Sequence, residues 1–584
     1  TQGVSSAASD VYKRQYILSM LFAATIGTTM VSCSDDDNLG DAPRLFRPIA
    51  SATVNSNNLK VEWDKIQGAT SYELELGLVT STDEDGTNHL KVIKKATTED
   101  DTYTFDDLGW DEKYGVRIKC IGNNKESEYY QVKAQSINYP TKVSGAKAID
   151  NAARVSWAEG GQKIKYVMAC PAEDAENHDT ISVKVSDADY AQGYVDIYGL
   201  QPETSYTFKT YDSSSDFNNT TYAGKTTATT KASVNFDEEY GEGMWLDTRN
   251  WDAKEAKDTL KTAEFWNMVK DGMTVILRGE QEYKISNAIN LDRNVTFITG
   301  MTLGGNAQFT FSGGMNVKKG VNIDKVKFES IDMISDKQAD KDAFLAGTDK
   351  GFGGRQVINV SGTGSTISEL IFNDCYIRGF RGVVRGQKNS DNFLNITFKG
   401  CTIDGVGDQG VVTIADKGGD FRNVTFDDCT ITNIIMLCDL RKTAQAPTVN
   451  VNNCTFCYAP METTANANTP LFRFATNAAN LNITNSIFGP SMATDGSAGS
   501  KLQLYTPGVK GSVLLNGAST VLSVAGSYKT NFAYTPIGAD AKTYGIEGLI
   551  DFKGSETDLW TNPVNGEFKF NANLDSEAGA SKWK

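Results

Sequence analysis

Histidine is almost absent from this sequence, which has 2 among its 584 residues, His89 and His178. Beyond residue 178 there is therefore no histidine to act as a general base or as a metal ligand. Glycine-rich phosphate loops, Ser-His-Asp arrangements and zinc-ligand spacings are missing as well. These absences exclude several common catalytic designs from the longer, C-terminal part of the chain.

Positive charge is also in short supply. The chain has 57 Lys and Arg against 73 Asp and Glu, which gives a net charge of −16 at pH 7. Proteins that bind nucleic acid need a basic surface to release counterions from phosphates, so a nucleic-acid partner is not expected. An anionic ligand of another kind would need a local basic patch.

One apolar run, Tyr16–Val31, follows two basic residues and ends at Cys33. It is short for a membrane span and resembles a signal peptide that ends in a bacterial lipobox. The acidic triplet at 35–37 resembles the surface-export signal of Bacteroides-group lipoproteins. We therefore expect lipidation of Cys33 and an outer-membrane, surface-exposed protein, the alternative being a generic secretory signal. Residues 1–15 lack an initiator Met, so 1–33 reads as an artefactual leader plus signal peptide.

A short motif recurs between residues 326 and 488. Its copies begin at residues 326, 370, 396, 424, 449 and 481 and read VKFESIDM, LIFNDCYI, ITFKGCTI, VTFDDCTI, VNVNNCTF and LNITNSIF. Apolar and polar residues alternate, and the phase then slips by one residue where Asn, Asp or Gly is usual. This pattern predicts a short strand, a tight bend and a second short strand.

Stacked copies about 4.8 Å apart would place like residue on like residue. The predicted inward ladders are Phe328/Phe372/Phe398/Phe426/Val451/Ile483, Ile331/Cys375/Cys401/Cys429/Cys454/Ser486 and Met333/Ile377/Ile403/Ile431/Phe456/Phe488. Thr402, Thr430 and Thr455 are expected to stack outward. We expect the stacked cysteines to be buried free thiols, because Ile331 and Ser486 replace Cys at the ends of the same ladder as core fillers. No metal site is expected, because inward stacking leaves no room for tetrahedral ligation.

The repeat resembles the right-handed parallel β-helix of the pectate-lyase superfamily, over residues 235–584. The resemblance implies an all-β fold but leaves the activity open, because this superfamily holds lyases, esterases, polygalacturonases, tailspikes and binding proteins. A helix with Ala256, Leu260 and Ala263 on one face is expected to cap the N-terminal end. The region around Trp560 resembles a closing cap, the alternative being a small sugar-binding element built on Trp560.

Two copies of another strand pattern precede the repeat, at 45–139 and 141–232. Each has an early Trp, at 63 or 157, and a Leu six residues before a Tyr. These pairs, Leu108/Tyr114 and Leu200/Tyr206, are similar to the tyrosine corner of fibronectin type III domains. Tandem sandwiches of this kind are expected to act as spacers.

The candidate ligand-binding residues are mostly basic. Aligning Gly382–Arg385 with residues 410–413, 435–438 and 470–473 puts Arg385 and Arg473 in one column with Cys438. The residues expected to contact an acidic glycan are Arg378, Arg381, Arg385, Lys388, Asp416, Lys417, Arg441, Lys442, Arg473 and Tyr376. Phe380 and Tyr458 could join Tyr376 as a stacking platform. The competing interpretation is a solvated face on which the basic residues pair with Asp404, Asp408 and Asp439.

The sequence therefore predicts a polysaccharide-binding surface lipoprotein for an acidic, pectin-like glycan. It would serve a glycan-uptake system together with an outer-membrane transporter, and it needs no cofactor. A histidine-independent polysaccharide lyase is the first alternative, with Lys388, Arg385 or Arg441 as catalytic candidates and Ca²⁺ as the cofactor. A structural or adhesive surface protein is the second alternative.

Overall fold

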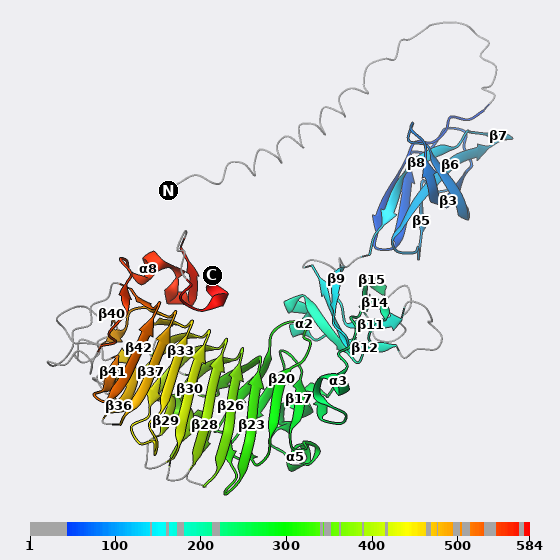
Figure 1. Ribbon diagram of the computed structural model, residues 1–584. Coiled ribbons are helices and arrows are strands. Elements are labelled where there is room, and N and C mark those ends of the chain that lie inside the picture. The colour runs from blue at the N-terminus through cyan, green and yellow to red at the C-terminus, as the bar shows by residue number, and fades with distance from the viewer. Residues whose placement is uncertain are drawn as a thin grey trace. The chain divides into compact units, whose positions relative to one another are not determined.

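The computed structural model describes residues 44–139, 143–158, 163–171, 180–212, 222–338, 343, 352–360, 364–387, 391–414, 419–462, 469–475, 477–493, 503–504, 514–530, 545–571 and 577–584. The predicted signal segment with Cys33 lies outside these residues, as do Lys388, Asp416 and Lys417. Strands dominate the described part of the chain, so the all-β class is confirmed (Figure 1). No helix in this part is long and apolar enough to cross a membrane.

The chain divides into two compact units, and the first ends at Pro140. This unit is built from two antiparallel sheets, one with the order β1-β2-β5 and the other with β4-β3-β6, in which β7 and β8 also pair with β6. The strands are β1 (Ala50–Asn55), β2 (Asn58–Trp63), β3 (Ser71–Thr82), β4 (Asn88–Thr98), β5 (Thr102–Phe105), β6 (Glu112–Gly122), β7 (Lys125–Glu126) and β8 (Tyr130–Ile137).

The second unit opens with another pair of antiparallel sheets, with the orders β13-β10-β9 and β12-β11-β14-β15. Its elements are β9 (Val143–Ala148), β10 (Ala152–Trp157), β11 (Tyr166–Pro171), β12 (Ile181–Lys184), α2 (Asp187–Gln192), β13 (Tyr194–Tyr198), β14 (Ser205–Tyr211) and β15 (Tyr222–Thr229).

Both sandwiches contain the predicted buried Trp and tyrosine corner. Trp63 and Trp157 are each 6% exposed and lie in the two cores. The hydroxyl of Tyr114 accepts a hydrogen bond from the Gly109 N–H at 2.9 Å. The hydroxyl of Tyr206 accepts one from the Gln201 N–H at 3.0 Å. The spacing in the sequence therefore predicted these two tertiary contacts correctly.

The rest of the second unit alternates between two long parallel sheets, which we call sheet one and sheet two (Figure 1). Sheet one has the order β16 (Trp245–Asp247), β17 (Met273–Leu277), β20 (Val295–Thr299), β23 (Asn322–Glu329), β26 (Thr366–Asn373), β28 (Asn392–Lys399), β30 (Phe421–Asp427), β33 (Thr448–Asn452), β37 (Ala479–Thr484) and β42 (Thr520–Ala525).

Sheet two has the order β18 (Glu282–Ile285), β21 (Ala307–Phe311), β24 (Ile331–Ser335), β27 (Tyr376–Gly386), β29 (Thr402–Ile414), β31 (Thr430–Ile434), β34 (Thr455–Cys457), β38 (Ile487–Phe488), β43 (Tyr528–Lys529) and β44 (Ile550–Asp551). Four further strands belong to sheet two: β25 (Gln356–Val360) pairs with β27, β32 (Cys438–Asp439) pairs with β29, β36 (Phe472–Ala475) pairs with β32, and β41 (Leu515–Gly517) pairs with β36. A smaller pairing joins β19 (Asn290–Leu291) to β22 (Asn316–Val317). Strand β39 (Met492–Ala493) pairs with β35 (Met461–Glu462) on one side and with β40 (Gln503–Leu504) on the other. The 3₁₀ turn η1 is Phe352–Gly354.

From β23 to β38, each passage from sheet one to sheet two turns through one residue in the left-handed region. The residues at this bend are Ser330, Asp374, Gly400, Asp428, Asn453 and Asn485, with φ between 47° and 64°. Small polar residues and glycine tolerate this conformation best, as the motif predicted. A Cβ on Gly400 would also lie 2.0 Å from the Asp374 carboxylate, so glycine fits there for a second reason.

The predicted inward ladders are confirmed by the register of the strands. Phe328, Phe372, Phe398 and Phe426 stack with ring centroids 4.7–5.3 Å apart and nearly parallel planes. Cys375, Cys401, Cys429 and Cys454 are buried free thiols, as predicted. Burial raises the pKa of the Cys375 and Cys429 thiols, which keeps them protonated.

The N-terminal end of the parallel sheets is covered by short helices. These are α3 (Phe236–Tyr240), α4 (Ala253–Thr259) and α5 (Ala263–Met268). Ala256 and Leu260 are buried in the sheet core as predicted, but Ala263 is exposed, so its predicted place on the buried face is wrong. The reason is that the Thr262 side chain caps a new helix and resets the phase, which buries Phe265 instead.

The second sandwich is joined to the parallel sheets by buried charges. Arg249 donates to both oxygens of Asp150, at 2.8 and 3.0 Å, and also pairs with Asp247. Arg249 and Asp150 are 3% and 2% exposed. Arg278 lies over the Tyr198 ring at 3.4 Å. The second sandwich is therefore part of one compact unit with the parallel sheets.

Candidate functional site

A row of outward side chains crosses the strands of sheet two. The register places Asp332, Tyr376, Thr402, Thr430 and Thr455 in one column, one residue per strand from β24 to β34. Two residues further along these strands, a second column holds Arg378, Asp404 and Thr432. Outward positions of a parallel sheet in register thus bring together side chains that are far apart in the sequence.

The C-terminal part of the chain folds back onto this face. It consists of α8 (Glu556–Leu559), β45 (Trp560–Asn562), η3 (Pro563–Asn565), β46 (Glu567–Phe570) and η4 (Ser581–Trp583). We call residues 577–584 the wall segment. Its contacts are with the outward threonines and the bends: the Ala580 N–H donates to Thr455 at 2.9 Å, Ser581 donates to Asp428, and Trp583 Nε1 donates to Thr430 at 2.7 Å.

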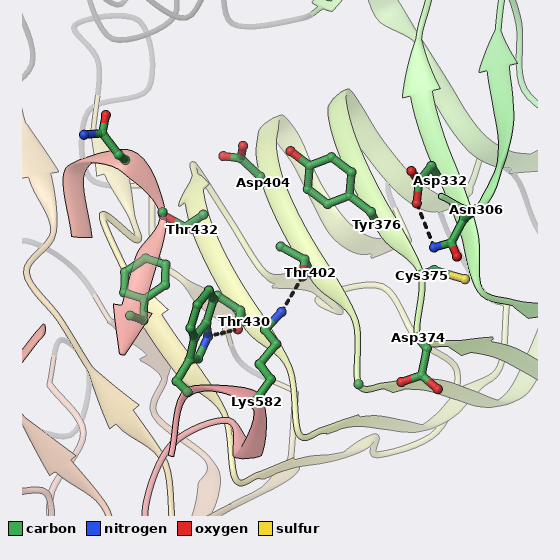
Figure 2. A pocket seen from close by; sticks show the side chains of 15 residues that line it. Asn306, Asp332, Asp374, Cys375, Tyr376, Thr402, Asp404, Thr430, Thr432 and Lys582 are labelled. Carbon is green, nitrogen blue, oxygen red and sulfur yellow. Dashed lines mark hydrogen bonds between the residues drawn. The ribbon is translucent and has the colours of Figure 1, made fainter. Parts of the chain in front are cut away.

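A pocket of about 400 Å³ lies between the outward face of sheet two and this C-terminal part. Figure 2 shows Asp332, Tyr376 and Asp404 on the strands, with Lys582 reaching Thr402 from the wall segment. The lining residues are Asn306, Asp332, Asp374, Cys375, Tyr376, Gly400, Thr402, Asp404, Thr430, Thr432, Asn565, Gly566, Phe568, Lys582 and Trp583.

The surroundings of several ionisable side chains in the pocket disfavour their charged forms. Burial raises the pKa of Asp332, although a hydrogen bond at 3.0 Å from Asn306 partly offsets this. Burial likewise raises the pKa of the Asp374 carboxyl and of the Tyr376 hydroxyl, and it lowers the pKa of the Lys582 ammonium. Asp404 is better compensated, since it accepts from Asn433 at 2.7 Å and lies 3.7 Å from Arg378.

This arrangement suits a ligand with many hydroxyl groups. Carboxylates accept hydrogen bonds strongly, threonine and asparagine both donate and accept, and aromatic rings offer an apolar face. Titratable groups with shifted pKa values in a concave, polar pocket are also a typical sign of a functional site. Among the described residues, no group of three His, Cys, Asp or Glu side chains is arranged to hold a metal ion.

Three of the predicted ligand-binding residues of β27 lie towards its two ends. Tyr376 and Arg378 lie at or beside the pocket, at the start of β27, whereas Arg385 lies near the other end of that strand. There Arg385, Thr413, Asp439 and Arg473 share one column. The column of Arg385 and Arg473 is thus confirmed, but its third member is Asp439 and not Cys438. Cys438 pairs with Val412 and is fully buried, so the predicted alignment was one residue out of register there.

Most of these arginines have carboxylate partners. Arg381 donates to both oxygens of Asp408, and Arg441 donates to both oxygens of Asp439 at 2.7 Å. Arg473 lies 3.6 Å from the same Asp439. The competing interpretation, in which Asp404, Asp408 and Asp439 pair with the basic residues, therefore describes these contacts. Lys442 is exposed beside Arg441.

The predicted stacking platform is wrong in two of its three members. Phe380 is fully buried and packs edge-on against Phe311. Tyr458 is 6% exposed and belongs to a core that also holds Trp560. Trp560 has no exposed surface, so a sugar-binding element built on its ring is excluded. Of the predicted aromatic residues, Tyr376 is the one that lines the pocket.

Several pocket residues were missed by the sequence interpretation. Asp332 occupies the same motif position as Tyr376, so placing the motif copies in register was enough to find it. Lys582 and Trp583 lie outside every repeat, and no spacing in the sequence connects them with Thr402 and Thr430.

Comparison with known proteins found solved structures of fibronectin domains. The chain matches no protein-family model and no curated protein. Among solved structures, it is similar to a two fibronectin type-III domain segment from chicken tenascin, with 14% identity over 32% of this chain and 100% of that chain, and a TM-score of 0.15. It is also similar to the FN1-FN3 domains of chicken CNTN1, with 14% identity over 33% of this chain and 67% of that chain, and a TM-score of 0.14.

Proposed function

We propose that this chain is a surface lipoprotein, anchored through Cys33, that binds a glycan in the pocket on sheet two. In this proposal the parallel sheets form a right-handed parallel β-helix and the sandwiches are fibronectin type III-like. The protein would hold the glycan at the outer membrane for a neighbouring transporter. The observation that carries the proposal is the pocket itself, where partly buried carboxylates border Tyr376, Phe568 and Trp583.

The charges favour a neutral glycan over an acidic one. Asp332, Asp374 and Asp404 line the described pocket against one ammonium, that of Lys582. A uronate carboxylate would meet this excess of negative charge, since like charges in a partly buried place repel one another. Neutral sugar hydroxyls would instead donate to the same carboxylates.

A second candidate uses the far end of β27 and keeps the acidic glycan. Arg441 and Arg473 share the single carboxylate of Asp439, so these three side chains carry more positive than negative charge. This surplus suits a uronate, either in binding or in a histidine-independent β-elimination.

Isothermal titration of the chain from Arg44 onward separates the two candidates. Xylan, mannan and arabinogalactan are the neutral probes, and polygalacturonate and alginate with Ca²⁺ are the acidic ones. We expect heat from a neutral probe, and a loss of affinity of about tenfold in Tyr376→Ala and in Asp404→Ala. Arg441→Ala is the matched control and should bind the neutral probe normally.

The opposite pattern contradicts this proposal. Binding of an acidic probe that Arg441→Ala weakens and Tyr376→Ala leaves unchanged would assign the site to the arginine column. A rise in absorbance near 235 nm with the acidic probes would identify a lyase. Absence of heat with every probe would favour the adhesive alternative.

A further inference from the structure

We infer that the pocket receives the end of a glycan chain and not a stretch from its middle. This inference rests on the proposed glycan binding and adds the part of the glycan that is recognised. It follows from the way in which the wall segment blocks one direction along the outward column of sheet two.

The outward column is open on one side of the pocket and covered on the other. Gln308, Asp332, Tyr376 and Thr402 are all partly exposed on successive strands. The next two residues of the column, Thr430 and Thr455, are each 1% exposed. The change occurs where Lys582 and Trp583 meet the strands. Lys582 donates to Thr402, as Figure 2 shows, and Trp583 donates to Thr430.

The wall segment is attached both to a bend beside the strands and to the core around Trp560. Ser581 donates to the Asp428 carboxylate from both its N–H and its hydroxyl. The Trp583 ring packs edge-on against Phe568 with centroids 5.7 Å apart, and the Lys582 ammonium lies 5.2 Å from the Trp583 ring. Phe568 in turn belongs to the core around Trp560.

The available length is short. From the strand of Asp332 to the strand of Thr430 there are three strand spacings, or about 14 Å. The pocket volume of about 400 Å³ is near the lower end for small-molecule sites. A glycan lying along the column therefore has room for a short piece before it meets Lys582 and Trp583. These two side chains offer the terminal sugar an ammonium donor and an aromatic ring.

The test is the binding stoichiometry measured by titration with a short and a long chain of the same sugar. Xylohexaose is paired with soluble xylan, and mannohexaose with soluble mannan. We expect one protein molecule per glycan chain in both members of a pair, since each chain offers one matching end. A number of bound proteins that grows with chain length would overturn this inference and leave the proposed function standing. Absence of heat from all four probes and from arabinogalactan would overturn both.

Two variants test the stop directly. A chain that ends at Ala580 lacks Lys582 and Trp583, and we expect it to bind several molecules per xylan or mannan chain and to lose about tenfold in affinity for the hexaose. If the shortened chain does not fold, Trp583→Leu in the full chain takes its place as the test. We expect this variant to weaken hexaose binding by a similar factor. Lys569→Ala, an exposed change on β46, is the matched control. Unchanged stoichiometry and affinity in both variants would contradict the role of the wall segment.

Discussion

Asp332 occupies a position that opposes its ionisation. Its carboxyl is partly buried on β24, its hydrogen-bond partner is the neutral Asn306 amide, and burial raises its pKa. A group whose pKa is raised by folding binds its proton more tightly in the folded state. Stability therefore falls as the pH rises through the window from the unfolded pKa, about 3.9, to the raised folded pKa.

Replacing this carboxyl with an amide should stabilise the protein. We expect Asp332→Asn to raise the thermal midpoint at pH 7, because the cost of the buried charge is removed, while the difference shrinks below about pH 4. Differential scanning calorimetry across this pH range measures the effect. Asp324→Asn, an exposed change on β23, should alter nothing. A lower midpoint at pH 7 for Asp332→Asn would show that the carboxylate is stabilised by contacts other than that with Asn306.

The repeated element is the bend between the two sheets. Asn453 has φ = 51°, between β33 and β34, in the left-handed region that β-branched residues avoid. We expect Asn453→Val to lower the free energy of unfolding by about 1 to 2 kcal/mol, and Asn453→Gly to be close to neutral. Urea denaturation compares both with Asn452→Val, which lies in the extended strand β33 and should tolerate the change. Equal losses for Asn453→Val and Asn452→Val would mean that backbone strain is not the cause.

The elements of this fold could be predicted from the sequence to different degrees. The ladders of Phe372 and Phe398 follow from alternation and the repeated bend, both of which are local. The break between α4 and α5 was missed because the cap at Thr262 competes with a continuous apolar face. The one-residue error at Cys438 arose in a segment where inward and outward residues are all buried, so hydrophobicity could not fix the register.

The pocket was less predictable than the ladders. Its strand side follows from the register, which places Asp332 beside Tyr376. Its other side comes from Lys582 and Trp583, which contact residues more than 150 positions earlier in the chain. Such contacts depend on tertiary folding and leave no periodic trace in the sequence.

At the scale of the whole molecule, the chain forms two compact units. The second sandwich shares buried ion pairs with the parallel sheets, whereas the first sandwich is a unit of its own. We expect calorimetry to resolve two transitions, one for each unit. Three transitions would show that the second sandwich unfolds independently of the sheets.

The Asp150–Arg249 pair should govern the larger transition. Asp150→Ala leaves a buried guanidinium with Asp247 as its remaining carboxylate partner in the described junction, and we expect a loss of about 3 kcal/mol. Lys163→Ala removes an exposed ion pair with Asp187 in the same unit and should cost less than about 1 kcal/mol. Denaturant titration followed by tryptophan fluorescence measures both. Equal losses of stability in the two variants would show that the buried pair stabilises the unit no more than the exposed pair does.

The wall segment has a consequence for the order in which the pocket forms and opens. The strands beneath the wall segment pair Tyr376 with Thr402, 26 positions apart, and Thr402 with Thr430, 28 positions apart, whereas Trp583 meets Thr430 across 153 positions. Closing the longer loop costs more chain entropy, so the strands assemble first and the wall docks afterwards. In the native protein, the same hierarchy makes the wall the first part to detach by local unfolding. Amide hydrogens of residues 581–583 should therefore exchange with solvent sooner than those of the threonine strands beneath them. The rate at which a ligand enters and leaves the pocket would then be set by the local unfolding of the wall segment.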